Sequence, residues 1–106
     1  MLAEARVADV LGAAGWQVLD RNWRGGGGEL DLVVCRDESL RFVEVKLRAQ
    51  TDDSADEAIT ASKRSKLRSA ARAWMAQRQE DWPDLAFLVA IVRPEGEVVW
   101  TDDAFA

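Results

Sequence analysis

Four charged side chains occur at alternating positions in two neighbouring apolar segments of the sequence. Glu29 and Asp31 lie in the first segment, and Glu44 and Lys46 lie in the second. Alternate residues of a β-strand point to the same face of a sheet, so each pair would share a face. Carboxylates are preferred ligands of Mg²⁺ and Mn²⁺, and a neighbouring lysine can stabilise developing negative charge. These residue types are therefore suited to metal-assisted chemistry on an anionic substrate.

The spacing of the two segments predicts which of these side chains face each other. If the polar run between the segments forms the turn of a hairpin, Asp31 lies opposite Glu44 and Glu29 lies opposite Lys46. Two opposed carboxylates repel each other, and burial makes their charge more costly. A bound divalent cation would relieve both effects. One alternative remains open, in which the strands form a solvated edge and the charges face water; apolar residues on both faces of the hairpin argue against it.

The composition excludes several other kinds of chemistry. The 106 residues contain no His and no Tyr, and Cys35 is the single cysteine, so imidazole catalysis, a tyrosyl nucleophile and a disulfide are all excluded. The net charge of −5 argues against a protein that coats nucleic acid over its whole surface. The first residues include acids and no apolar core of a signal peptide, which favours a cytoplasmic protein that does not engage a membrane.

The remaining residues predict one α/β domain spanning residues 1–106 with the element order αβββαββ. A helix of about a dozen residues ends at Gly15, and a second helix runs from Asp56 to Gln79. The four consecutive glycines place residues Arg21–Gly28 in a loop. The expected strands are Trp16–Leu19, Leu30–Cys35, Leu40–Leu47, Leu85–Val92 and Val98–Trp100.

Basic residues gather on the long helix, which carries no acid between Ala61 and Gln79. Arg64 and Arg68 belong to a stripe away from the apolar face, whereas Lys63 lies beside that face and nearer the sheet. Contact with phosphate groups is the functional interpretation. An ordinary solvated helix face is the alternative. The residues expected to bind nucleic acid are Lys63, Arg64, Lys66, Arg68 and Arg24, the last of which lies beside the glycines.

Glu4 is a further acidic candidate on the opening helix. It flanks the apolar stripe that would pack on the sheet, so its side chain could reach the end of the sheet. Alternatively, it is an ordinary helix-start acid favoured by the helix dipole.

An acid on an opening helix, an Asp on one strand and Glu-x-Lys on the next resemble the site pattern of the PD-(D/E)xK nuclease superfamily. The runs RNWRGGGGELDLVV, FVEVKLR and EAITASKRSKL further resemble the YraN family of bacterial proteins, which is similar to archaeal Holliday-junction resolvases. The resemblance implies a restriction-endonuclease-like fold, with a mixed central sheet flanked by helices. The matching residues are Glu4, Asp31 and Glu44 for the acids, Lys46 for the lysine, Glu29 for a Gly-Glu pair and Lys63 for a lysine on the long helix. The sequence departs from the family in its long glycine run, in Ala55 where proline is common and in the few residues before Glu4.

The resemblance implies a Mg²⁺- or Mn²⁺-dependent endonuclease acting on DNA, with branched DNA among the candidate substrates. Asp31, Glu44 and the carbonyl of Val45 would hold the ion, and Glu4 and Glu29 could help to hold a second ion or position water. Lys46 would orient the attacking water or stabilise the phosphate. We also expect a homodimer, which would double the basic surface and place two sites on one duplex.

A second hypothesis is a catalytically silent module that keeps the nuclease fold but acts by binding nucleic acid or protein. The acidic net charge slightly favours this hypothesis. The presence of both Glu44 and Lys46 favours the enzyme.

Overall fold

The computed structural model describes residues 2–48 and 61–102, which form an α/β fold in the expected order αβββαββ. The part of the expected long helix that precedes Ala61 lies outside the described residues. The elements are α1 (Leu2–Ala13), β1 (Gln17–Gly25), β2 (Gly28–Arg36), β3 (Ser39–Leu47), α2 (Ala61–Arg78), β4 (Asp84–Val92) and β5 (Val98–Asp102).

The strands form one mixed sheet in the order β1-β2-β3-β4-β5, with β3 at the centre. β3 and β4 are parallel, and the other neighbouring pairs are antiparallel. A parallel pair needs a crossover connection, and α2 lies between these two strands in sequence. The predicted register of the β2–β3 hairpin is confirmed, since Val33 pairs with Phe42 and Cys35 pairs with Leu40.

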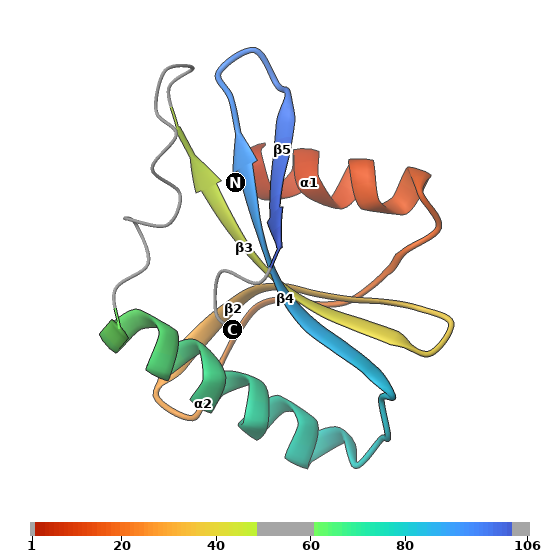
Figure 1. Ribbon diagram of the computed structural model, residues 1–106, viewed down its shortest axis with the longest axis vertical. Coiled ribbons are helices and arrows are strands. Elements are labelled where there is room, and N and C mark those ends of the chain that lie inside the picture. Colours follow the sequence, from red (N-terminus) through yellow and green to blue (C-terminus); the bar gives the residue numbers. More distant parts are fainter. Residues whose placement is uncertain (1, 49–60, 103–106) are drawn as a thin grey trace.

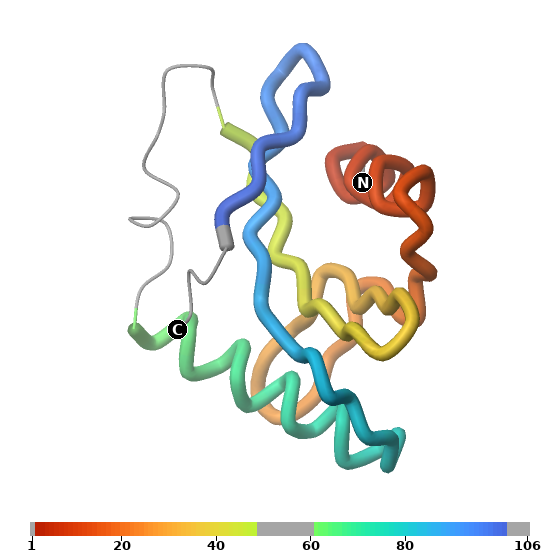
Figure 2. Tube along the Cα trace, turned by 45° about the vertical axis from the view of Figure 1, so that its right-hand side comes forward, coloured from red at the N-terminus to blue at the C-terminus, as the bar shows by residue number. Residues whose placement is uncertain are grey.

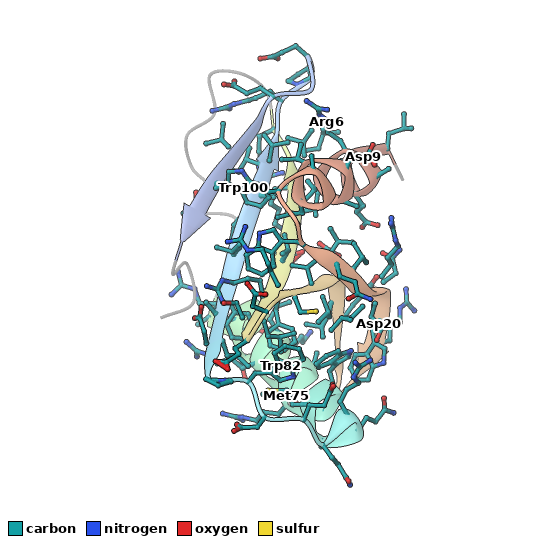
Figure 3. The ribbon with its side chains drawn as sticks, turned by 90° about the vertical axis from the view of Figure 1, so that its right-hand side faces the viewer. Arg6, Asp9, Asp20, Met75, Trp82 and Trp100 are labelled. Carbon is teal, nitrogen blue, oxygen red and sulfur yellow. The ribbon has the colours of Figure 1, made fainter. Side chains whose placement is uncertain are left out.

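The two helices cover opposite faces of the sheet (Figure 1, Figure 2). On one face, Leu67 and Trp74 of α2 pack with Phe42 of the central strand. On the other face, Val7 and Leu11 of α1 pack against a separate group of buried strand residues. In the side view, Met75 and Trp82 lie on the α2 side, and Arg6 and Asp9 belong to α1 (Figure 3). This sandwich of helix, mixed sheet and helix is a restriction-endonuclease-like fold.

The expected loop over Arg21–Gly28 is wrong, because most of this segment is strand. β1 continues through Gly25, and only Gly26 and Gly27 form the turn, both with positive φ angles of 60° and 84°. Two-residue turns of this type need positive φ, which glycine adopts at low cost. The expected strand Trp16–Leu19 therefore covers only the first third of a longer edge strand that begins at Gln17.

Two glycines of this run, Gly26 and Gly28, are also required by α2, which packs directly on the turn. An added Cβ at Gly26 would lie 2.5 Å from the carbonyl oxygen of Ser69, and one at Gly28 would overlap the carbonyl oxygen of Lys66. The Ser69 hydroxyl also donates a hydrogen bond of 2.6 Å to the carbonyl of Gly26. The glycine run thus allows backbone to meet backbone, which holds the start of β2 against α2.

Within the part of the chain that the structure describes, neither helix is long and apolar enough to cross a membrane.

Candidate active site

Asp31 lies where β2 and β3 stop pairing. The backbone pairs of the two strands end at Leu32 and Val43, and the Asp31 side chain continues the contact by accepting a hydrogen bond of 2.8 Å from the Val45 N–H. A carboxylate oxygen thus takes the place of a backbone carbonyl in the ladder. This hydrogen bond fixes Asp31 next to the part of β3 that carries Glu44.

Glu44 is a buried carboxyl group on the central strand, with 8% of its surface exposed. It lies one position beyond the last paired residues, Leu32 and Val43, and lines the same pocket as Asp31. Burial, followed by the hydrogen bond and charge of Asp31, raises the pKa of Glu44 to about 8. The folded protein therefore holds two carboxyl groups together where one of them resists ionisation.

Two lysines face this carboxyl pair. The ammonium group of Lys63 on α2 lies 3.7 Å from a carboxylate oxygen of Glu44. Lys46 lies two residues after Glu44 on β3, and burial together with the neighbouring Lys63 lowers the pKa of Lys46 to about 8. A buried acid whose pKa is raised beside a lysine whose pKa is lowered is an arrangement typical of functional sites.

A pocket of about 240 Å³ opens between β2, β3 and α2. Its lining residues come from all three elements and are Gly28, Glu29, Asp31, Glu44, Lys63, Lys66 and Leu67. Glu29 belongs to the pocket but is not held opposite Lys46 as expected, because the β2–β3 ladder has already ended. Instead it pairs with Arg24 on β1, with 3.5 Å between Arg24 Nε and a Glu29 oxygen.

The structure divides the expected nucleic-acid-binding residues between the two flanks of α2. Lys63 and Lys66 line the carboxylate pocket, and Arg24 lines an adjoining hollow that shares Gly28 and Glu29 with it. Arg68 lies on the other flank beside Leu85 and Phe87 of β4.

Arg64 differs from the exposed residue that its spacing predicted. It is half-buried, and its Nε is enclosed without a hydrogen-bond partner among the described residues. The reason is its position two turns before Ala71, on the flank of α2 that packs towards β4. Arg64 therefore does not belong to a freely solvated stripe.

Glu4 lies in the helical layer on the other side of the sheet from the pocket. It is a half-buried residue in the first turn of α1, which packs on the sheet face opposite α2. Within residues 2–48 and 61–102, no three acidic or thiol side chains gather into a group that could hold a metal ion. The structure thus brings Asp31 and Glu44 together, without placing Glu4 beside them as a third ligand.

The donor set nevertheless fits a hard divalent cation. Mg²⁺ commonly binds to one or two carboxylates, keeps several waters and completes its shell with substrate phosphate oxygens. Asp31 and Glu44 supply two carboxyl groups in an open pocket, and their mutual repulsion would be relieved by a cation. The site therefore suits an ion shared between protein, water and substrate.

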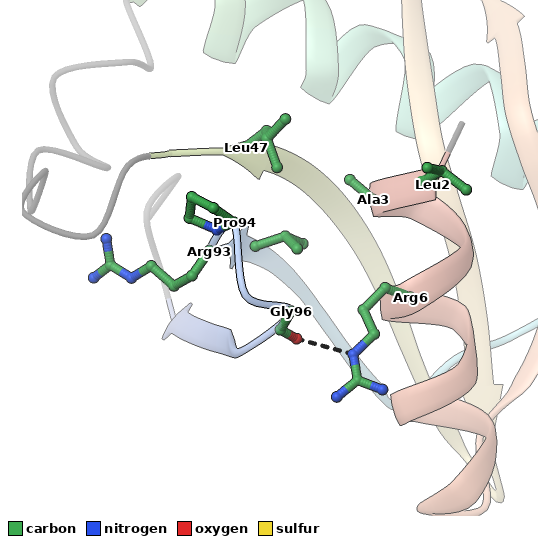
Figure 4. A pocket seen from close by; sticks show the side chains of 8 residues that line it. Leu2, Ala3, Arg6, Leu47, Arg93, Pro94 and Gly96 are labelled. Carbon is green, nitrogen blue, oxygen red and sulfur yellow. Dashed lines mark hydrogen bonds between the residues drawn. The ribbon is translucent and has the colours of Figure 1, made fainter.

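Another hollow, of about 530 Å³, lies at the far side of the molecule between the start of α1 and the β4–β5 turn (Figure 4). Its lining is largely apolar and includes Leu2, Leu47 and Pro94. Arg6 crosses its rim and donates a hydrogen bond of 2.9 Å to the carbonyl of Gly96. Among the residues that the structure describes, no carboxylate lines this hollow.

Residues 3–92 match the model of the uncharacterised protein family UPF0102. The chain belongs to this family. UPF0102 proteins similar to it occur in Rhodopseudomonas palustris (39% identity over 87% of the chain), Frankia casuarinae (50% over 63%) and Rhodococcus opacus (34% over 96%). The aligned regions make up 71%, 58% and 91% of the lengths of these relatives, respectively.

In this UPF0102 chain, the position of Lys63 was predicted only in part from the sequence. The sequence placed it beside the apolar stripe and assigned it to nucleic-acid binding. The structure pairs it with Glu44 inside the pocket. The available signal was its position four residues before the buried Leu67, which turns a side chain towards the sheet.

Proposed function

We propose that this UPF0102 protein is a Mg²⁺- or Mn²⁺-dependent endonuclease that hydrolyses phosphodiester bonds in DNA. The observation that carries the proposal is the pairing of Asp31 with the buried Glu44, with Lys46 on the same strand and an open pocket in front of them. When bound, such an ion supplies Lewis-acid polarisation of the phosphate and of the attacking water. No histidine is required for this chemistry, in agreement with a sequence that has none.

The proposal assigns metal binding, catalysis and phosphate contact to different groups of residues. Asp31, Glu44 and the carbonyl of Val45 would hold the cation. Lys46, whose lowered pKa allows it to exchange a proton near neutral pH, orients the attacking water or stabilises the charge that develops on the phosphate. Lys66 and Arg24 lie at the pocket and the adjoining hollow, where they can contact phosphates on either side of the scissile bond.

The activity is tested by incubating the purified protein with linear, flapped and four-way DNA in Mn²⁺ or in EDTA. We expect cleavage of at least one substrate in Mn²⁺ and none in EDTA. Asp31→Asn should abolish cleavage. Asp9→Asn is the matched control, because it removes the same charge from an exposed position on α1 (Figure 3). Cleavage that survives in Asp31→Asn would contradict the proposed site.

Thermal melts test the metal site independently of cleavage. An ion that binds only the folded protein raises its melting temperature. We expect Mn²⁺ to stabilise the parent protein and Asp9→Asn but not Asp31→Asn. Binding of DNA without cleavage of any substrate, combined with melts that do not respond to Mn²⁺, would instead favour the catalytically silent binding module.

A further inference from the structure

The contact between Lys63 and Glu44 places a cation of the protein itself at the buried carboxyl group. Glu44 is only 8% exposed, and the Lys63 side chain retains 38% of its exposure. The two residues come from different layers, since Glu44 lies on the central strand and Lys63 lies in the first turn of α2. One partner is therefore held by the sheet, while the other reaches the pocket on a long side chain from its rim.

A divalent cation and the Lys63 ammonium would neutralise the same carboxylate. Both act on Glu44 from within the pocket that Lys63 lines, so close approach of one opposes close approach of the other. Lys46 adds a second positive charge on the same side of Glu44, and the nearby Lys63 helps to lower the pKa of Lys46. Repulsion between two ammonium groups favours release of the one that can move to solvent, which is Lys63.

We propose that Lys63 is the resident counter-ion of Glu44 whenever that carboxyl group is ionised, that a divalent cation enters the site by displacing it, and that the released ammonium then contacts substrate phosphate. This inference rests on the proposed function, because it concerns the same metal site. It makes metal loading an exchange of one cation for another. It also makes Lys63 available to phosphate only after the exchange.

Isothermal titration with Mn²⁺ tests the exchange without relying on activity. The variants are Lys63→Met, which removes the competing charge, and Lys66→Met, which removes a charge from the same pocket without an ion pair to Glu44 among the described contacts. We expect the Kd for Mn²⁺ to fall roughly two- to fivefold in Lys63→Met, the range set by a partly exposed ion pair. Lys66→Met should change it by less than about twofold, because its exposed charge is screened.

Several outcomes would overturn the exchange and are distinct from failure of the metal site. Equal tightening in both variants would show a general charge effect. Weaker binding by Lys63→Met would show that Lys63 positions Glu44 rather than competes for it. If neither the parent nor Lys63→Met binds Mn²⁺, the proposed metal site itself is wrong, and the exchange is overturned with it.

The role of the released lysine is tested by the salt dependence of DNA binding. A fluorescent phosphorothioate duplex, which keeps the backbone charge and resists hydrolysis, is titrated with the parent protein and with Lys63→Met, so that Lys46 stays in place in both. In EDTA the two salt slopes should agree, because Lys63 remains on Glu44. In Mn²⁺ the slope should be steeper by about one for the protein that keeps Lys63. Equal slopes in Mn²⁺ would exclude the phosphate contact.

Discussion

Replacing Glu44 with glutamine should remove a loss of stability that the parent protein shows between about pH 5 and pH 8. The pKa of Glu44 rises from its usual value of 4.5 to about 8 on folding, chiefly through burial and then through Asp31. Between these values the unfolded chain has released the proton and the folded protein still holds it. Stability therefore falls as the pH rises through this window.

The size of this effect follows from linkage. Where the folded state holds one proton more than the unfolded state, the free energy of unfolding changes by about 1.4 kcal/mol for each pH unit. This sets an upper limit of about 5 kcal/mol for Glu44. The pKa of about 8 already includes the opposing effect of Lys46 and Lys63, which favour the ionised carboxylate. We expect a fall on the order of 2 kcal/mol across the window. The lowered pKa of Lys46 acts between about pH 8 and its usual 10.5, where stability rises with pH, and so lies outside the measurement.

Urea unfolding in EDTA at pH 5, 6, 7 and 8 measures this dependence. Tryptophan fluorescence is a suitable signal because the chain has five tryptophans, among them the buried Trp74. As the pH rises, the free energy of unfolding of Glu44→Gln should increase relative to that of the parent. Glu29→Gln, which removes a carboxylate from the same pocket, is the control and should keep the dependence of the parent. Parallel curves for the parent and Glu44→Gln would refute the burial of a protonated Glu44.

Other expectations follow from the contacts around the pocket. Gly28→Ala should destabilise the protein by about 2 kcal/mol or more in urea unfolding, because its Cβ overlaps the carbonyl of Lys66. Gly27→Ala meets open space and should cost only about 1 kcal/mol of backbone strain. Equal losses in the two variants would contradict the close packing. Lys66→Ala should lower the salt slope of DNA binding by about one, and Arg72→Ala, on the other flank of α2, should leave it unchanged. Lys46→Met should lose cleavage but keep the stabilisation by Mn²⁺; a loss of both would assign Lys46 to the metal site instead.

The hairpin that carries the site could be predicted from the sequence because its pattern is local. Alternation of side chains and a short turn fix the pairing of β2 with β3, and a slip by one residue would move Asp31 and Glu44 to different faces. The same regularity predicts that the two carboxyl groups lie together. The hydrogen bond from Val45 to Asp31 adds a detail that the pattern could not supply, namely that the strands separate at this point.

The glycine run could not be interpreted in the same way. Consecutive glycines are typical of loops, and nothing near them in sequence shows why a strand would contain them. Their explanation is the backbone of Ser69 and Lys66, more than 35 residues later, which leaves no room for side chains at Gly26 and Gly28. The ion pair of Lys63 with Glu44 is likewise a contact between layers, so the sequence could indicate only the side of the helix from which Lys63 departs.

The hydrogen bond from Val45 uses one oxygen of the Asp31 carboxylate. Its Oδ2 accepts the Val45 N–H of β3, and this bond uses one of the lone pairs of that oxygen. A cation bound through Oδ1 alone would leave the bond intact, whereas bidentate binding would make Oδ2 serve the ion and the backbone together. The hydrogen bond thus links the denticity of Asp31 as a ligand to the junction of the two strands.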